Sequence, residues 1–295
     1  MSATEQVTLE RKWELGLVWE KHFVEQEGAD RPTFLFGWCS VHLLRAAMAE
    51  FLATMLFLFF VITTARFAPI NRGASLGDEY LVTDTGELAS SIFMIAFSFG
   101  LSIFVLVYIF AGVSGGNLNP AVSLGLLLGK RISIQRFVLY VIAQVLGAMA
   151  GAGIATVFTD EIAGGYNAVT EGIEPENAFG GEVLCTFVLV LTVFAATDGE
   201  LMSKLGHIPT LLPFAIGMAV LLAHIVMIPI DQCSINPARS FATAVTNDEW
   251  ADHWVFWIGP LVGGALAPIV WESLLRPEQP VPRKTTVQAK AGTDV

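Results

Sequence analysis

The tripeptide Asn-Pro-Ala occurs twice in this chain, at Asn119-Pro120-Ala121 and at Asn236-Pro237-Ala238, 117 residues apart. Asparagine is a good helix cap, and proline fits the first helical turn because its missing N–H would have no intrahelical partner there. Each motif therefore predicts the start of a short helix, with a positive dipole end and an amide NH2 group at its tip. For one motif alone, an unrelated helix cap is the simpler interpretation. Two motifs at matched places favour two tips that face one lumen.

The composition predicts a polytopic membrane protein. Hydrophobic residues make up 54% of the 295 residues and charged residues 15%, and the mean hydropathy is +0.62, which is unlike a water-soluble chain. A membrane-spanning helix needs about 20 mostly apolar residues. Six stretches qualify, at roughly 43–65, 88–111, 135–159, 179–197, 209–230 and 253–275.

The segments that the two motifs open are too short to span a bilayer. Non-helical backbone at membrane depth is tolerated only where protein buries it or where it lines a water-filled cavity. These segments are therefore pore candidates. The expected fold is an all-α membrane protein with six transmembrane helices and two re-entrant half-helices.

Basic residues orient the chain. If both termini are cytoplasmic, the external loops hold only Arg66, Arg72 and Arg239, which agrees with the positive-inside rule. The residues on the cytoplasmic side are then Arg45, Lys130, Arg131, Arg136, Lys204, Arg276, Arg283 and Lys284. The net charge of −11 comes from the loops and an acidic N-terminal segment. No basic footprint for a nucleic acid is present.

The cysteines do not predict chemistry. Cys39, Cys185 and Cys233 have neither metal-ligand spacing nor an evident disulfide partner. We expect no metal, no cofactor and no catalytic residue, and therefore no enzyme.

The two halves of the chain align on their motifs. Residues 97–101 pair with residues 214–218, and the glycine in each segment, Gly100 or Gly217, lies 19 residues before its Asn. Three spans in each half force the copies into opposite orientations, which places the site at the midplane of an inverted repeat. The predicted organisation is an N-terminal segment over 1–40, a channel domain over 41–276 with repeats at about 41–159 and 178–275, and a C-terminal tail over 277–295.

Glu50 and Glu182 are ionisable residues inside apolar spans, where they are unfavourable unless they are hydrogen-bonded. Both lie at matched places of the repeat. We expect them to accept hydrogen bonds from the N–H groups of the half-helix loops. Proton coupling is the alternative, and it favours more intramembrane acids and a basic partner.

The two motif segments, 114–122 and 235–240, resemble the two signatures of the major intrinsic protein family, the aquaporins and glycerol facilitators. The resemblance covers essentially everything from Arg45 to Arg276. It implies a homotetramer in membrane lipid, each subunit with its own pore, through which water passes and reorients at Asn119 and Asn236.

The resemblance also implies a selectivity filter of the narrow type found in strict water channels, at Phe99, His224, Cys233 and Arg239. Taken singly, these residues fit a packing aromatic, a satisfied core histidine and a paired or snorkelling arginine. Together they fit a narrow ring with a fixed positive charge. Glycerol facilitators lose this histidine and carry an acid after the arginine, whereas this chain has Ser240.

Within the family, segments such as 103–108, 164–169 and 252–257 resemble plant plasma-membrane intrinsic proteins, which implies a plasma-membrane protein with cytoplasmic termini. Those channels are gated from the cytoplasm by the loop that matches residues 197–213. The resemblance implies gating positions at Ser133 for phosphorylation, His207 for pH, Leu211 for the plug and Asp30 for an acidic anchor.

Two further partners are predicted from short motifs. The last four residues, 292–295, have the form of a PDZ ligand. Thr285 and Thr286 follow two basic residues, as in kinase sites.

The alternative functions are a channel for CO2, hydrogen peroxide or small neutral solutes, and a structural or junctional membrane protein with little conductance.

Overall fold

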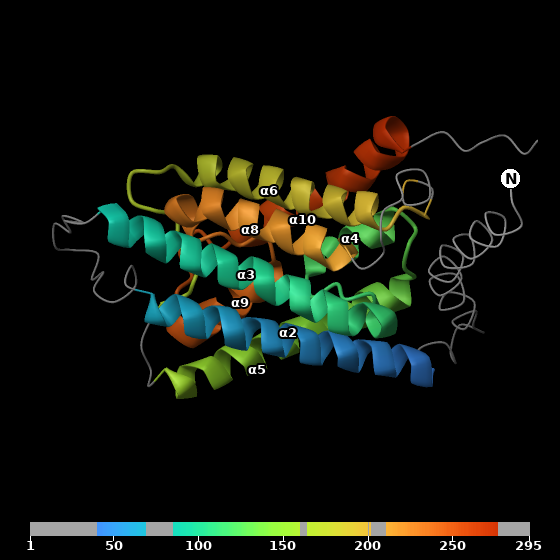
Figure 1. Cartoon of the computed structure of the whole chain (residues 1–295), viewed down its shortest axis with the longest axis horizontal. Helices are drawn as coiled ribbons and strands as arrows, with labels where there is room; N and C mark the ends of the chain where they lie inside the picture. Colours follow the sequence, from blue (N-terminus) through green and yellow to red (C-terminus); the bar gives the residue numbers. More distant parts are fainter. Residues whose placement is uncertain (1–39, 69–84, 160–163, 200, 202–210, 277–295) are drawn as a thin grey trace, which may run out of the picture.

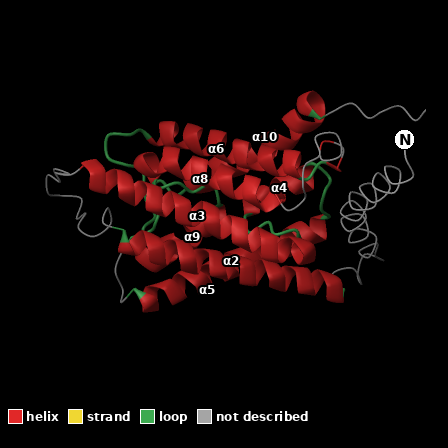
Figure 2. Cartoon of the chain, viewed as in Figure 1, coloured by secondary structure: helices red, strands yellow, loops and turns green. Residues whose placement is uncertain are grey.

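The computed structural model describes residues 40–68, 85–159, 164–199, 201 and 211–276. In these residues all regular secondary structure is helical (Figure 2). The helices are α2 (Val41–Phe67), α3 (Thr85–Ser114), α4 (Pro120–Leu128), α5 (Ile134–Phe158), α6 (Pro175–Ala196), α8 (Leu212–Asp231), α9 (Pro237–Asn247), α10 (Val255–Val270) and the π-helical turn η4 (Trp271–Leu275).

Six of the described helices are long and apolar enough to cross a membrane: α2, α3, α5, α6, α8 and α10 extended by η4. The short helices α4 and α9 have nine and 11 residues. At a rise of about 1.5 Å per residue, neither reaches across a hydrocarbon core of about 30 Å. The predicted all-α fold with six spans and two half-helices is confirmed.

The helix contacts repeat across the two halves of the chain (Figure 1). In the first half α2 packs on α5 and α3, and in the second half α6 packs on α10 and α8. The central pair, α3 with α8, joins the halves. Each half-helix packs on the other half's third span, α4 on α10 and α9 on α5. This exchange is the contact pattern of an inverted repeat.

Glycines allow the long helices to approach closely. A Cβ added at Gly147 or Gly151 of α5 would collide with the backbone carbonyl oxygens of Phe51 or Met55 in α2. Gly263 of α10 lies in the same way against the backbone of α6. Without a hydrophobic drive between helices in lipid, such close packing is a main source of association.

The outer faces of the bundle are apolar. In the most hydrophobic window of each span only 39–50% of residues are buried inside the protein. The exposed positions include large apolar side chains such as Leu146, Val226 and Ile269. Such a surface fits contact with lipid tails.

Replacement of Gly151 by alanine is expected to force α2 and α5 apart, with a loss of about 1–3 kcal/mol of stability from overpacking. The melting temperature of the purified protein in detergent measures this loss. Gly153 of the same helix has open space around its Cβ position, so Gly153→Ala is the matched control. Equal melting temperatures for the two variants would contradict the packing role of Gly151.

Candidate functional site

The two Asn-Pro-Ala motifs lie at facing helix tips. Asn119 caps α4, and its Oδ1 accepts a hydrogen bond from the N–H of Ala121 at 2.8 Å. Asn236 caps α9, and its Oδ1 accepts from the N–H of Ala238 at 3.1 Å. In both tips proline occupies the first helical position.

The tips are bonded to each other across the repeat. Nδ2 of Asn119 donates to the carbonyl of Ile235 at 2.6 Å, and Nδ2 of Asn236 donates to the carbonyl of Leu118 at 2.9 Å. Each side-chain amide carries two N–H donors. One donor of each asparagine therefore holds the two halves together, which leaves the second N–H of each amide for a solute.

Glu50 holds the loop that leads into α4. Its side chain is fully buried, and its two oxygens accept hydrogen bonds from the N–H of Asn117 at 3.0 Å and of Leu118 at 2.8 Å. The hydroxyl of Ser114 and the amide of Gln144 donate to the same carboxyl at 2.6 and 2.8 Å. These bonds satisfy backbone groups that have no helical partner.

Glu182 does the same in the second half. It is fully buried, and its oxygens accept from the N–H of Ser234 at 2.6 Å and of Ile235 at 2.7 Å. The two positions whose N–H groups donate, 234 and 235, match 117 and 118 in the repeat.

Three of the four predicted filter residues lie together. The rings of Phe99 and His224 are 3.9 Å apart between centroids and inclined at 33°. The guanidinium carbon of Arg239 lies 5.6 Å from the Phe99 ring centre. The fourth residue, Cys233, is fully buried.

The filter candidates present unused polar atoms. Nδ1 of His224 lies 2.8 Å from the carbonyl of Val220, which only accepts, so the proton is on Nδ1. Nε2 of His224 is thereby a buried acceptor without a protein partner among the described residues. Nε of Arg239 is a buried donor that also lacks a protein partner among them. Buried polar groups without protein partners call for water or a ligand.

Asn167, which was not among the predicted site residues, orients the arginine. Its Oδ1 accepts hydrogen bonds from NH1 of Arg239 and from the hydroxyl of Ser240, the latter at 2.7 Å. Its Nδ2 donates to the backbone carbonyl of Asp231 at 3.1 Å. Asn167 is buried although it lies in a polar loop between α5 and α6. Gly164 and Gly165, which have positive φ values, are the feature of the sequence near it that indicates a turn of this loop into the bundle.

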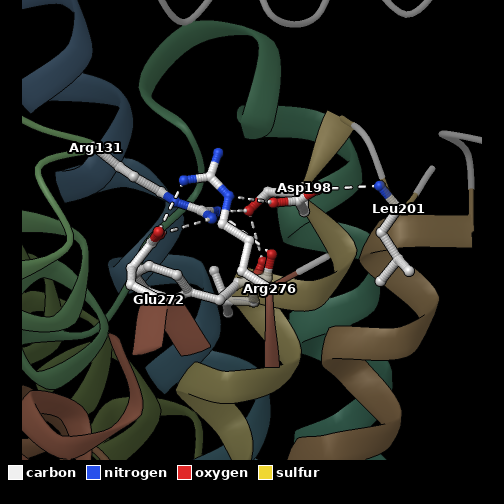
Figure 3. A network of polar contacts seen from close by, with 8 residues as sticks. Arg131, Asp198, Leu201, Glu272 and Arg276 are labelled. Atoms are coloured by element: carbon white, nitrogen blue, oxygen red, sulfur yellow. Dashed lines mark hydrogen bonds and ion pairs between the residues drawn. The ribbon is translucent and has the colours of Figure 1, made fainter. Parts of the chain in front are cut away.

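An ion-pair network closes the end of the bundle at which α6 and η4 finish (Figure 3). Asp198, whose side chain is 2% exposed, pairs with Nε of Arg276 at 3.4 Å. NH1 of Arg276 donates to Glu272 at 2.8 Å, and Glu272 lies 3.9 Å from NH2 of Arg131. The network ties the loop after α4 to the ends of α6 and η4.

Arg131 is the most buried cation of this network. It donates to the hydroxyl of Thr197, and its guanidinium lies 4.0 Å from the centre of the Phe194 ring. Burial lowers the pKa of Arg131 to about 10, although Glu272 and Asp198 act in the opposite direction. Arg131 therefore stays charged at neutral pH.

The predicted gating residues are only partly described. Ser133 caps α5, and its hydroxyl accepts a hydrogen bond from the N–H of Arg136 at 3.3 Å. Leu211 directly precedes α8 and is 52% exposed. His207 and Asp30 lie outside the described residues, as do Thr285, Thr286 and the last four residues.

Residues 37–271 match the model of a protein family described as "Major intrinsic protein". The chain belongs to the major intrinsic protein family. Among curated members it is 45% identical over 243 residues to "Probable aquaporin PIP2-7" of Oryza sativa subsp. japonica, with 80% of this chain and 81% of that protein covered. It is 42% identical over 239 residues to "Aquaporin PIP2-1" of Arabidopsis thaliana, with 79% and 81% covered.

A solved family structure shares the fold. The chain aligns with the aquaglyceroporin from Plasmodium falciparum at a TM-score of 0.65 and 22% identity, over 80% of this chain and 98% of that one. At this identity the likeness concerns the fold alone.

Replacement of Glu50 by glutamine is expected to destabilise the protein, because an NH2 group then faces donors that the carboxylate satisfied. A buried group left without its hydrogen bond typically loses about 1–3 kcal/mol. The matched control is Glu174→Gln, since Glu174 is exposed and makes no cap hydrogen bond with its side chain. A melting temperature for Glu50→Gln equal to that of the control would contradict the loop-holding role.

Proposed function

We propose that this protein is a passive water channel, a multi-pass protein of the plasma membrane and not an enzyme. The observation that carries the proposal is the meeting of two asparagine-capped half-helices beside a buried cluster of Phe99, His224 and Arg239. The names of its relatives, which are aquaporins at 42–45% identity, support the same function.

In this proposal water crosses in single file. At the filter, the Nε2 acceptor of His224 and the Nε–H donor of Arg239 offer a water molecule one hydrogen bond of each kind. At the midplane, the amides of Asn119 and Asn236 donate to the water oxygen and turn the molecule. The positive ends of both half-helices and the Arg239 charge oppose cations and hydronium.

The width of the filter excludes larger solutes in this proposal. Phe99 and His224 are in ring contact and both are buried, and the guanidinium carbon of Arg239 lies 5.6 Å from the Phe99 ring centre, which supports a narrow passage. A solute with a carbon chain would have to displace a ring. Water is therefore expected to pass and glycerol to be excluded.

Purified protein in liposomes tests both statements. We expect fast osmotic water flux with a low activation energy, and no glycerol flux above that of empty liposomes, by stopped-flow light scattering. His224→Ala should raise glycerol permeability about tenfold or more, since removal of a wall group relaxes size discrimination.

Leu222→Ala is the matched control for His224→Ala, because Leu222 lies on the same helix and is exposed on its outer face. It should leave both fluxes unchanged. Wild-type liposomes without fast water flux would overturn the channel and favour a structural membrane protein. Glycerol flux equal to water flux in the wild type would overturn the filter.

Assembly and regulation belong to the same proposal. A homotetramer with one pore in each subunit is supported by the family and by the apolar outer faces of the bundle. A kinase is proposed to act on Ser133 or on Thr285 and Thr286, and a PDZ-type partner to bind residues 292–295.

Gating from the cytoplasm is proposed for the loop over residues 197–213. The ion-pair network supports it, because Thr197 and Asp198 at the start of the loop are anchored to Arg131 and Arg276. Phosphate on Ser133 would place negative charge at the start of α5, two residues from Arg131. Protonation of His207 would add positive charge to the loop itself.

Replacement of His207 by alanine is expected to remove any loss of water flux when the cytoplasmic side is acidified from pH 7.5 to pH 6, roughly the range in which histidine gains its charge. The measurement is stopped-flow water flux at each pH. The control is His253→Ala, because burial lowers the pKa of His253 and so disfavours its protonation relative to an exposed histidine. A wild-type response to pH in the His207 variant would remove this residue from the mechanism.

A further inference from the structure

The loop that leads into the second half-helix has an unusual backbone. Gln232, Cys233 and Ile235 have φ values of 66°, 54° and 44°, in the left-handed region that residues with a Cβ rarely adopt. No glycine lies between the end of α8 at Asp231 and the cap of α9 at Asn236. The chain must hold this backbone by other contacts.

The first half shows what glycine does at the same places. Residues 115, 116 and 118 also have positive φ, at 99°, 65° and 55°, but the first two are glycines. There the hydroxyl of Ser114 accepts a hydrogen bond from the N–H of Gly116 at 3.1 Å. The two loops thus share one backbone form, and only the second must build it without glycine.

Asp231 takes the place of Ser114 in the second loop. Its Oδ1 accepts a hydrogen bond from the N–H of Cys233 at 2.9 Å, which is the same bond two residues along the chain. A hydrogen bond from the backbone N–H two residues on to an aspartate side chain closes an Asx turn, which fixes the local backbone. The Oδ1 acceptor of Asp231 thus closes the second loop, where the first loop has the hydroxyl of Ser114 and two glycines.

The turn that Asp231 closes carries two parts of the candidate filter. The carbonyl of Gln232 accepts from NH2 of Arg239 at 3.4 Å, and Cys233 is itself a filter candidate. Asn167, which accepts from the same guanidinium, is bonded to the Asp231 carbonyl.

We infer that Asp231 is a positioning residue of the filter: its side chain holds the Gln232–Cys233 turn, and the turn fixes Arg239 and Cys233 at the pore. This inference rests on the proposed water channel. Asp231 itself is fully buried and acts on the solute through these neighbours.

Two substitutions separate the turn from the charge. Asp231→Ala removes the acceptor of the Cys233 N–H, whereas Asp231→Asn keeps an Oδ1 acceptor and exchanges Oδ2 for an NH2 group, so that no negative charge can form there. We expect Asp231→Ala to lower water permeability and to raise the ratio of glycerol to water permeability, each about fivefold, as for the loss of one hydrogen bond. Asp231→Asn should stay within a factor of two of the wild type, as a matched acceptor does.

The permeability ratio is the deciding readout, because partial misfolding would lower both fluxes together and leave their ratio unchanged. Permeabilities are normalised to folded protein in the liposomes. Asp248→Ala serves as the control, since Asp248 is an exposed aspartate with φ of 53° at the end of α9, away from the turn.

Three results would overturn the inference. A wild-type ratio in Asp231→Ala would show that the turn does not set the filter, and the same loss in both variants would show that the charge matters and not the turn. If only Asp231→Asn folds, a glycerol-to-water permeability ratio in that variant that differs from the wild type would likewise show that the charge matters and not the turn. Wild-type liposomes without water flux would overturn the channel as well, so the two failures are distinguishable.

Discussion

The buried carboxylates of Glu50 and Glu182 carry the constraint on which the rest of the structure depends. A path for a polar solute through the bundle needs backbone that leaves the helix at membrane depth, and each unsatisfied N–H there is strongly unfavourable. Each glutamate accepts from two consecutive loop N–H groups. The half-helices can begin inside the bundle because these four groups are satisfied.

The inverted repeat gives this constraint a common solution in both halves. Each half-helix packs on the last span of the other half, and each cap asparagine donates to a carbonyl of the other loop. The halves are therefore not separate units that touch, because the site exists only when both are folded together. The filter candidates break the symmetry, since His224, Cys233 and Arg239 all come from the second half.

Polar contacts around the second loop, which leads into the proposed filter, differ from those around the first. The first loop contains two glycines, and the hydroxyl of Ser114 accepts a hydrogen bond from the N–H of Gly116. The Glu50 carboxyl that holds this loop also accepts from Ser114 and Gln144. The second loop uses Asp231 and leads into Arg239, which Asn167 and the Gln232 carbonyl orient. A fixed guanidinium in a narrow passage needs such rigid acceptors, because its donors must face the solute in one direction.

The sequence alone determined the helical elements. Apolar runs of about 20 residues form spans, and each Asn-Pro-Ala begins a helix. Six spans, two half-helices and the repeat could therefore be predicted from the residues. The family resemblance added the filter positions. Beyond Glu50 and Glu182, only the tertiary structure decided which polar groups satisfy one another. No motif gave Asn167 or Asp231 a role in the site, and the network of Arg131, Asp198, Glu272 and Arg276 joins residues far apart in the chain. Such contacts depend on how separate helices and loops fold together, which neither periodicity nor spacing encodes.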